Sequence, residues 1–339
     1  MRVPLVPGET PSRNTAELLR SAGRLLAPLG VLLVLAAYFA WRTEGRYLQA
    51  DSLANIGQQS AVIVIVGVGA TLVIIAGGID LSVGAVVAFS GTLAAVAMLE
   101  HGVPPPAAAL LAIAAGAAIG CFNGVMTVKT RLHPFIITLG AMMIFRGLAL
   151  ALTDARNTSL LPEAFTAIAA GELAIPLGGG KELALTSNLV AYIIVVSLTA
   201  HLMLTRTRLG RYCFAIGSNP HSARLSGIPV DRCVTLYFTL AGMLFGFAGV
   251  IQTARMGIGQ PTGNDGMELE AIAAAVIGGT SLSGGRGSVL GTLLGAVLMA
   301  SLRQGLRMLN LPPYYQTVSL GAAIIIAVVY DRFSRRTTA

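Results

Sequence analysis

Residues 77–84 read GGIDLSVG, and they lie between two apolar runs that are each long enough to cross a bilayer. Residues 278–285 read GGTSLSGG in the same kind of setting, with five identical positions at an offset of 201 residues (278 − 77). A glycine-rich interruption frees backbone groups that lipid cannot satisfy, so it persists only where protein buries it or water reaches it. Two copies in the two halves of one chain therefore predict a membrane transporter built from repeats.

The composition also indicates a membrane protein. The chain has 339 residues, of which 55% are hydrophobic and 11% charged, whereas soluble domains carry about 25% charged residues. The net charge of +8 is typical of Lys and Arg in cytoplasmic loops and does not indicate nucleic-acid binding. Cys121, Cys213 and Cys233 lack CxxC spacing, so neither a disulfide framework nor a metal site is expected.

The apolar segments predict an all-α integral membrane protein of about ten transmembrane helices with glycine-rich helix breaks. The expected segments are 25–41, 52–76, 82–99, 106–128, 134–152, 187–204, 232–255, 267–278, 288–306 and 314–331. The eighth is short for a span, so it is either a half-helix or a re-entrant piece. With both termini in the cytoplasm, most of the 23 Lys and Arg residues fall on the inside, as the positive-inside rule requires.

This topology divides the chain into a cytoplasmic N-terminal tail (1–24), one polytopic transmembrane domain (25–331) and a cytoplasmic C-terminal tail (332–339). Two loops are longer than connectors, 153–186 on the outside and 205–231 on the inside. In the second loop, Asn219 suits an N-cap, Pro220 the first helical position, and Gly227 the end of a short helix. This helix is either a docking site for a soluble partner or part of an ordinary basic loop.

Polar residues at the two breaks are candidate functional residues, because ionisable groups at membrane depth are costly. Asp80 precedes Ser82 at the start of an apolar run, so it either caps that helix or serves a pathway directly. Ser283 is expected to match Ser82 in the second copy. We interpret the breaks as hinge and helix-start elements beside a pathway, formed by Gly77, Gly78, Asp80, Ser82, Gly278, Gly279 and Ser283.

Two further polar groups lie in or near apolar segments. Arg146 is inside segment 134–152, so we expect it to pair with a carboxylate, Asp80 being one candidate, or with backbone carbonyls. The other group surrounds the start of segment 267–278 and consists of Asn264, Asp265, Glu268 and Glu270. The acids either complement the helix dipole or form a polar rim at the outer mouth of the pathway.

Two glycine ladders predict close packing of helix backbones. One contains Gly116, Gly120 and Gly124, and the other contains Gly287, Gly291 and Gly295. In each ladder the four-residue spacing places the glycines on one helix face, so these positions are read as structural.

Four stretches carry a resemblance to a known family. They are GGIDLSVGAVVAFSG from Gly77, HPFIITLGAMMIFRGLAL from His133, GSNPHSARLSGI from Gly217 and MELEAIAAAVIGGTSLSGGRGSVLGTLLGA from Met267. In these motifs, and over about residues 25–331, the chain resembles the permease subunit of bacterial monosaccharide ABC importers of the ribose, xylose and galactose type.

The resemblance implies a multi-pass protein of the bacterial inner membrane, surrounded by lipid and paired with either a second permease copy or a homologous permease. It also implies a periplasmic sugar-binding protein and a cytoplasmic ATPase that binds ATP and Mg²⁺, so this chain itself would hold no cofactor and no catalytic residue. Loop 153–186 would be periplasmic, and loop 205–231 would carry the coupling helix for the ATPase. The family positions in that helix are Asn219, Ser222, Ala223, Arg224 and Gly227, with Ser222-Ala223 standing where the family commonly has two alanines.

Two other function classes fit less well. An ion-coupled secondary transporter needs buried acids or histidines along its path, and this chain offers mainly Asp80. A membrane enzyme needs a nucleophile, a base or a metal cluster, and no HExxH or paired-carboxylate pattern occurs in a span. The sequence therefore favours the importer subunit, with the ion-coupled transporter as the alternative. Ribose, xylose, rhamnose and galactose are all candidate substrates.

Overall fold

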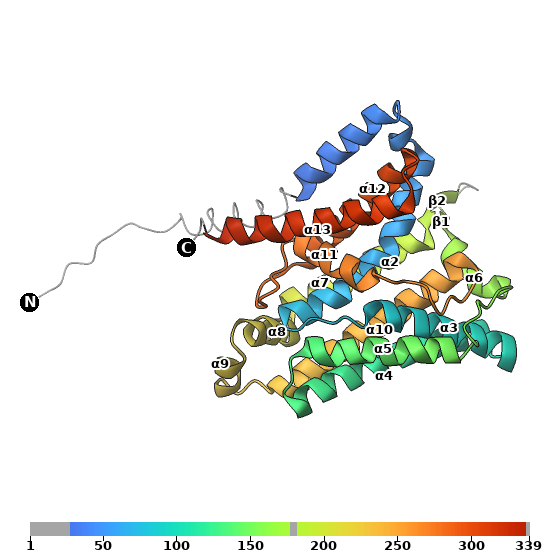
Figure 1. Ribbon diagram of the computed structural model, residues 1–339. Helices are drawn as coiled ribbons and strands as arrows, with labels where there is room; N and C mark the ends of the chain where they lie inside the picture. Colours follow the sequence, from blue (N-terminus) through green and yellow to red (C-terminus); the bar gives the residue numbers. More distant parts are fainter. Residues whose placement is uncertain (1–27, 177–181, 337–339) are drawn as a thin grey trace, which may run out of the picture.

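The computed structural model describes residues 28–176 and 182–336, most of which form helices (Figure 1). The predicted tail 1–24 and the end of the predicted tail 332–339 lie outside the described residues. In chain order the elements are the helix Pro28–Arg42, η1 (Arg46–Leu48), α2 (Ala50–Ile75), α3 (Val83–His101), α4 (Pro105–Thr130), α5 (Pro134–Ala151), α6 (Glu163–Ala170), β1 (Glu172–Pro176), β2 (Glu182–Ser187), α7 (Asn188–Arg206), α8 (Arg208–Ser218), α9 (Pro220–Leu225), α10 (Val230–Met256), α11 (Met267–Ile277), α12 (Val289–Met308) and α13 (Pro313–Arg336).

Seven of the ten predicted segments are helices long and apolar enough to cross a membrane within the described ranges: α2, α3, α4, α5, α7, α10 and α12. The first predicted segment corresponds to the helix Pro28–Arg42, and the last to the 24-residue helix α13. The eighth corresponds to α11, which has 11 residues. At 1.5 Å per residue α11 is about 16 Å long, roughly half of the hydrocarbon core, so it cannot span alone.

The segment around α11 nevertheless runs from one end of the bundle to the other. Before α11, Gly259 forms an isolated antiparallel bridge with Thr158 in the connection after α5. After α11, the N–H of Gly285 donates to the carbonyl of Ile75 at the end of α2, 2.8 Å away. A non-helical stretch followed by a half-length helix therefore covers the distance that one long helix covers elsewhere.

The predicted glycine ladders are packing seams, except at Gly287, which precedes α12 and whose Cβ would meet the Ile75 side chain rather than a helix backbone. A Cβ on Gly116 or Gly120 would overlap the backbone of α10 at Gly242 and Gly246 or at Phe238. A Cβ on Gly291 or Gly295 would overlap the backbone of Gly278 or Ala274. Backbones approach this closely only where side chains are absent, which is how helices associate in lipid.

The loops contain more structure than the sequence predicted. Residues 153–186 hold α6 and the antiparallel pair β1–β2, so the all-α prediction misses a small two-stranded sheet outside the long helices. Loop 205–231 holds α8 as well as the predicted short helix. Helix α8 buries Gly210, Cys213 and Ile216 and exposes Arg208 and Arg211. Burial raises the pKa of the Cys213 thiol to about 12, so this cysteine packs as an apolar group.

The two ends of the described chain share one side of the bundle. Figure 1 shows α13 running toward the side where α8 and α9 lie, and the blue helix Pro28–Arg42 beginning on that side. This arrangement requires an even number of crossings between the two ends.

Candidate functional site

The two glycine breaks and the end of α8 meet at one point, which we call the glycine junction (Gly77, Gly217, Gly284 and Gly285). A Cβ on Gly284 would lie 3.0 Å from Cα of Gly77 and 2.8 Å from the carbonyl oxygen of Gly217. A Cβ on Gly217 would overlap the carbonyl of Ile75, which accepts from the N–H of Gly285. The ends of α2, α8 and the stretch after α11 are therefore in backbone contact.

Side chains of α4 and α5 satisfy the first break. The N–H of Leu81 donates to the hydroxyl of Thr138 (3.0 Å), and that hydroxyl donates to the carbonyl of Ile79 (3.3 Å). Asp80 Oδ1 accepts from the N–H (2.8 Å) and the hydroxyl (2.6 Å) of Ser82, the N-cap residue of α3. The amide of Asn123 donates to the Ser82 hydroxyl (3.0 Å). Asp80 therefore holds the N-cap residue Ser82, but α3 has no side-chain cap hydrogen bond, so Asp80 does not accept from the free N–H groups of the helix as the capping interpretation expected.

Three buried acceptor atoms near this point have no hydrogen-bond partner within the described residues. They are Oδ2 of Asp80, Oδ1 of Asn123 and Oε2 of Glu268. Buried polar atoms in proteins are normally paired with protein or water. These atoms therefore retain hydrogen-bonding capacity that no group of the described residues uses.

The second break repeats the helix end of the first break but not the helix start that follows it. Gly77 (φ 91°) and Gly279 (φ 86°) both adopt the left-handed conformation that ends a helix, so the structural offset is 202 residues (279 − 77). The sequence alignment, which paired Gly77 with Gly278 and Gly78 with Gly279, is wrong by one residue. Ser283 does not match Ser82, because it lies in a turn, its N–H donates to the Ser281 hydroxyl (3.3 Å), and α12 begins only after Ser288.

The residues predicted for the outer mouth lie beside α3 and α5 rather than beyond their ends. A Cβ on Gly84, the second residue of α3, would lie 2.7 Å from Oε2 of Glu268 and would overlap the carbonyl of Asn264. Arg146, the thirteenth of the 18 residues of α5, forms an ion pair with Asp265 (2.5 Å) and donates to the carbonyl of Gly263 (2.5 Å). The stretch 257–266 therefore folds back among the helices and carries its polar groups with it.

Other charged residues near this stretch pair with side chains of neighbouring helices. Asp265, not Asp80, is the carboxylate that pairs with Arg146. Glu270 is separated from this group and pairs with Arg303 of α12, with 15% of its side chain exposed. Arg307 donates to the amide oxygen of Gln59 on α2. Glu268 and Glu270 both lie in the first turn of α11, where acids complement the helix dipole.

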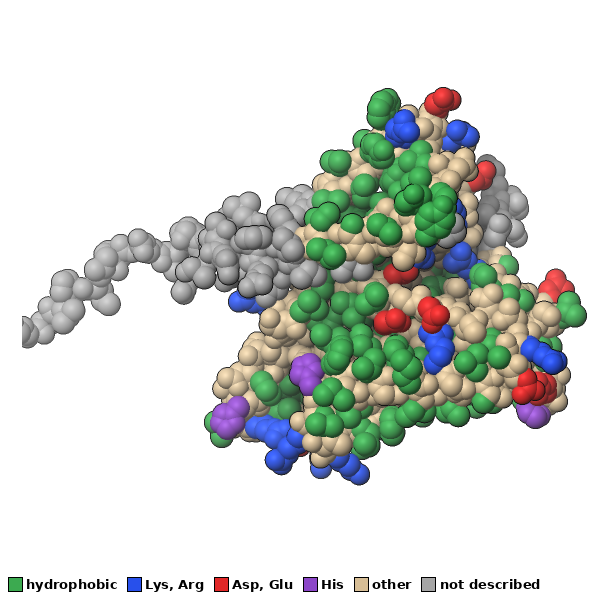
Figure 2. Space-filling view, in the orientation of Figure 1, with side chains coloured by type: hydrophobic (Ala, Val, Ile, Leu, Met, Phe, Trp, Pro, Cys, Tyr) green, Lys and Arg blue, Asp and Glu red, His purple; other side chains and the backbone are tan. Residues whose placement is uncertain are grey.

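A charged cluster therefore lies on a face that is otherwise largely apolar. Figure 2 shows charged side chains gathered above α5 in the middle of such a face. The side chain of Asp265 is 77% exposed, and that of Arg146 is 19% exposed. The same helix exposes Ile136, Met143 and Ile144. Since ionised groups are costly against lipid, this part of the face must border water or protein.

Replacing Arg146 with glutamine is expected to lower the free energy of unfolding by about 2 kcal/mol, because a charged donor to Gly263 and Asp265 is lost. Asp265→Asn is expected to cost less than about 1 kcal/mol, since the exposed carboxylate is solvated and Arg146 keeps the Gly263 carbonyl. Thermal unfolding in detergent micelles measures both, with the exposed Arg156→Gln as the control. Equal losses in the two variants would contradict this assignment of partners.

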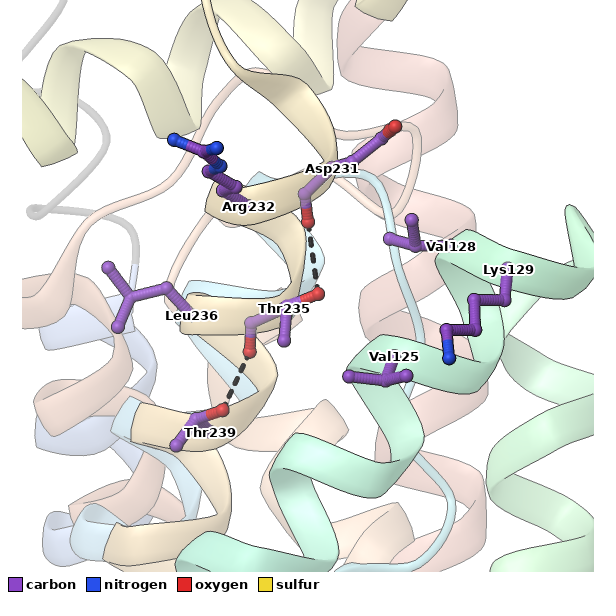
Figure 3. Close-up of a pocket in the computed structure, with 8 residues that line it drawn as sticks. All are labelled: Val125, Val128, Lys129, Asp231, Arg232, Thr235, Leu236 and Thr239. Carbon is purple, nitrogen blue, oxygen red and sulfur yellow. Dashed lines mark hydrogen bonds between the residues drawn. The ribbon is translucent and has the colours of Figure 1, made fainter.

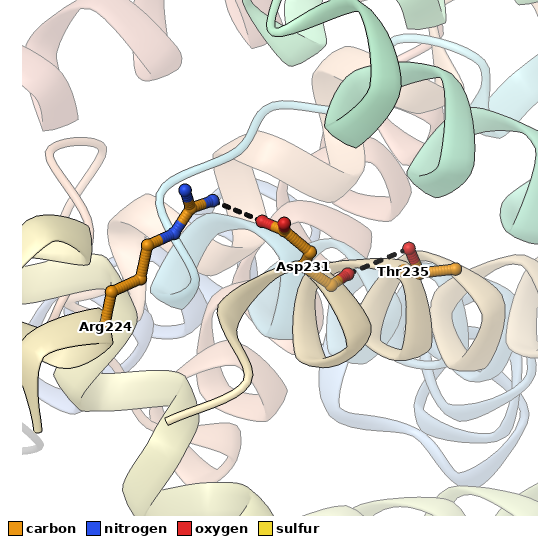
Figure 4. Close-up of polar contacts among 3 residues, drawn as sticks. All are labelled: Arg224, Asp231 and Thr235. Carbon is orange, nitrogen blue, oxygen red and sulfur yellow. Dashed lines mark hydrogen bonds and ion pairs between the residues drawn. The ribbon is translucent and has the colours of Figure 1, made fainter. Parts of the chain in front are cut away.

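Helix α9 forms in loop 205–231 as the sequence predicts. The side chain of Asn219 accepts from the N–H of Ser222 (3.0 Å), Pro220 is the first helical residue, and Gly227 (φ 81°) follows the helix. Arg224 pairs with Asp231 at the start of α10, and Thr235 donates to the Asp231 carbonyl one turn further along (Figure 4). Of the predicted coupling residues, Ala223 packs inward with 4% exposure.

Several contributing residues were missed by sequence reasoning. Leu225, at the end of α9, is 78% exposed, and Gly217 was noted only as the first residue of a motif. Asn123 and Thr138 support the first break from neighbouring helices. A polar residue within an apolar run was the available signal for Asn123 and Thr138. No group of His, Cys, Asp or Glu side chains able to hold a metal ion occurs in 28–176 or 182–336.

Comparisons with known proteins place the chain among transport permeases. A family model described as "Branched-chain amino acid transport system / permease component" matches residues 52–328. The ribose import permease protein of Escherichia coli (strain K12) is 41% identical over 300 residues, covering 88% of this chain and 91% of that protein. The D-allose transport system permease protein of the same organism is 38% identical, covering 89% and 90%. Its xylose transport system permease protein is 33% identical, covering 91% of each. No solved structure matches the chain.

Proposed function

Because this chain belongs to the family of ABC-importer permease components, we propose that it is the translocation subunit of an ATP-driven importer of a monosaccharide. It is a multi-pass protein of the bacterial inner membrane. The name of the family model refers to branched-chain amino acids, whereas the ribose, D-allose and xylose permeases are similar over about nine tenths of the chain. A pentose or hexose is therefore the proposed substrate.

The charged cluster on the apolar face carries this proposal. Arg146, Asp265, Asn264 and Glu268 lie beside spanning helices, and the acceptor atoms of Asp80, Asn123 and Glu268 lack partners within the described residues. A neutral polyol brings many hydroxyl donors, which such acceptors can bind without a counter-ion. The cluster therefore suits the edge of a hydrated path for a neutral sugar, which a second permease copy completes from the other side.

The proposed topology has ten crossings with both termini in the cytoplasm. The stretch 257–266 together with α11 supplies the eighth crossing, as a broken one. The side that holds α8 and α9 carries Arg206, Arg208 and Arg211, and it also holds Lys129 at the end of α4. This concentration of cations supports a cytoplasmic location for that side.

Two soluble partners complete the importer. An ATPase binds ATP and Mg²⁺ and docks on α9, which presents Leu225 and Arg224 outward. A periplasmic sugar-binding protein docks at the opposite end of the bundle. ATP-driven movement of α9 passes through α8 to the glycine junction, where it reaches α2 and the stretch after α11 at once. The charged cluster lies at the other end of α11. A sugar held there then becomes accessible from the opposite side of the membrane.

Uptake into vesicles tests the function. The chain is reconstituted with the ATPase and the binding protein, and labelled ribose, D-allose and xylose are offered with and without ATP. We expect accumulation of one sugar that requires ATP and is unaffected by a protonophore.

The alternative, an ion-coupled transporter, is favoured by one observation, the buried Asp80 carboxylate with an unpartnered oxygen. Uptake without ATP that a protonophore abolishes would establish that alternative.

Replacing Leu225 with aspartate is expected to weaken ATPase binding about 30-fold, because a side chain that anchors an interface as a hot spot contributes about 2 kcal/mol. Fold stability should not change, since the side chain is 78% exposed. Co-purification and titration of the ATPase measure the effect. Leu160→Asp is the matched control, an exposed leucine in the connection after α5. Unchanged ATPase binding in Leu225→Asp would exclude α9 as the docking helix.

A further inference from the structure

A groove lies between the cytoplasmic ends of α4 and α10. Its volume is about 440 Å³, within the range of small-ligand sites. Eight residues line it: Val125, Val128, Lys129, Asp231, Arg232, Thr235, Leu236 and Thr239. Figure 3 shows Val125 and Lys129 on α4 facing the edge of α10 that carries Thr235 and Thr239.

The wall of the groove is apolar although it contains two threonines. The hydroxyl of Thr235 donates to the carbonyl of Asp231 (3.0 Å), and that of Thr239 donates to the carbonyl of Thr235 (2.8 Å), as drawn in Figure 3. Both hydroxyls are therefore occupied within α10 itself. With Val125, Val128 and Leu236 they form a surface suited to hydrocarbon, at the depth where lipid chains lie.

The cytoplasmic end of the groove is cationic. Lys129 is the second-last residue of α4, and Arg232 is the third residue of α10, and both are exposed. Neither has an ion-pair partner in the part of the chain that the structure describes. The one acid of the lining, Asp231, is held by Arg224, as Figure 4 shows, so its charge is already balanced.

From the apolar wall and the two unopposed cations, we infer that this groove binds an anionic phospholipid of the cytoplasmic leaflet. The acyl chains lie against Val125, Val128 and Leu236, and the headgroup phosphate lies at the level of Lys129 and Arg232. Basic residues at the cytoplasmic ends of spanning helices attract anionic headgroups in this way. The bound lipid lies next to the Arg224–Asp231 pair that joins α9 to α10, which places lipid charge within reach of the docking helix.

Native mass spectrometry of the full chain in non-ionic detergent tests this inference, with phosphatidylglycerol titrated against phosphatidylcholine of the same acyl chains. The unaltered chain is expected to retain one phosphatidylglycerol per copy in preference to phosphatidylcholine. Lys129→Gln/Arg232→Gln is expected to bind phosphatidylglycerol about 30-fold more weakly, since each surface cation contributes roughly fivefold. Arg131→Gln, an exposed cation outside the lining, should stay within about twofold of the unaltered chain.

A variant that fills the groove distinguishes lipid binding in the groove from the general attraction of anionic lipid to a basic surface. Val125→Trp keeps both cations and occupies the groove, so it is expected to lose the retained lipid as well; Thr235→Trp serves the same purpose from the α10 wall. Full phosphatidylglycerol retention in the filling variants would overturn the inference. So would charge variants that keep the lipid but lose the ATPase, because the groove would then be a protein contact.

Discussion

Replacing Gly217 with valine is expected to lower ATP-driven sugar uptake by about 5- to 150-fold, while the ATPase stays bound. Gly217 is the point at which α8 touches both glycine breaks, and a Cβ there would overlap the Ile75 carbonyl and lie 2.5 Å from the Gly285 nitrogen. Overpacking of this kind costs about 1–3 kcal/mol, and 3 kcal/mol corresponds to a rate change of more than 100-fold. Vesicle uptake and co-purification of the ATPase measure the two quantities.

Sugar uptake and ATPase binding should respond differently to this change, because Gly217 lies outside α9. The N-cap hydrogen bond from Ser222 to Asn219 and the Arg224–Asp231 pair hold α9 without any contribution from Gly217. The docking surface should therefore survive, while the contact that passes movement to α2 and to the stretch after α11 is lost. The expected phenotype is ATP hydrolysis with reduced transport.

Two variants keep this prediction testable if Gly217→Val folds poorly. Gly285→Ala approaches the junction from the other side, because its Cβ would meet Ser218 while its position lies far from α9 in the chain. Gly30→Val is the matched control, since a Cβ at this helical glycine meets no atom of the chain within 4 Å. Uptake within threefold of the unaltered rate in both junction variants would show that the junction does not transmit movement.

Local signals were sufficient to predict the short helix α9 and most of the long helices. Asn219, Pro220 and Gly227 are capping and turn residues whose effect depends only on their neighbours in the chain, and all three occupy the predicted places. Apolar runs predicted seven spans for the same reason. The glycine ladders were also predictable, because a four-residue spacing of small residues has few uses other than close packing.

Features that depend on distant partners were not predictable. The partner of Arg146 is 119 residues away (265 − 146), and nothing near Arg146 distinguishes Asp265 from Asp80. Helix α8 was read as loop because its basic residues suggested solvent, although its buried face contacts α2 and α10 through Cys213 and Leu209. The alignment of the two breaks was wrong by one residue because it counted identities, whereas the conformation of Gly77 and Gly279 defines the helix end.

The second large effect is expected at the seam between α4 and α10. Gly120→Val should prevent stable folding or lower the midpoint of thermal unfolding by more than about 10 °C, because a Cβ there would overlap the carbonyl of Phe238 and lie 3.0 Å from Cα of Gly242. Helices in lipid gain most of their association energy from such close packing, so separating these backbones removes it over several turns. Thermal unfolding in detergent and the yield of the monodisperse protein measure the effect, and Gly57→Val, where a Cβ meets nothing within 4 Å, is the control.

A rescue experiment distinguishes backbone contact from simple crowding of side chains. At Gly69, on α2, a Cβ would meet the ring of Phe245 first, 2.6 Å from its Cε1 atom, so Gly69→Ala should be largely restored by Phe245→Leu. At Gly120 the obstructing atoms belong to the α10 backbone, and truncating the Phe238 side chain leaves its carbonyl in place. Gly120→Ala/Phe238→Leu should therefore remain as unstable as Gly120→Ala or more so. Recovery of Gly120→Ala by that second change would mean that side-chain volume, not the approach of the two backbones, sets the spacing of α4 and α10.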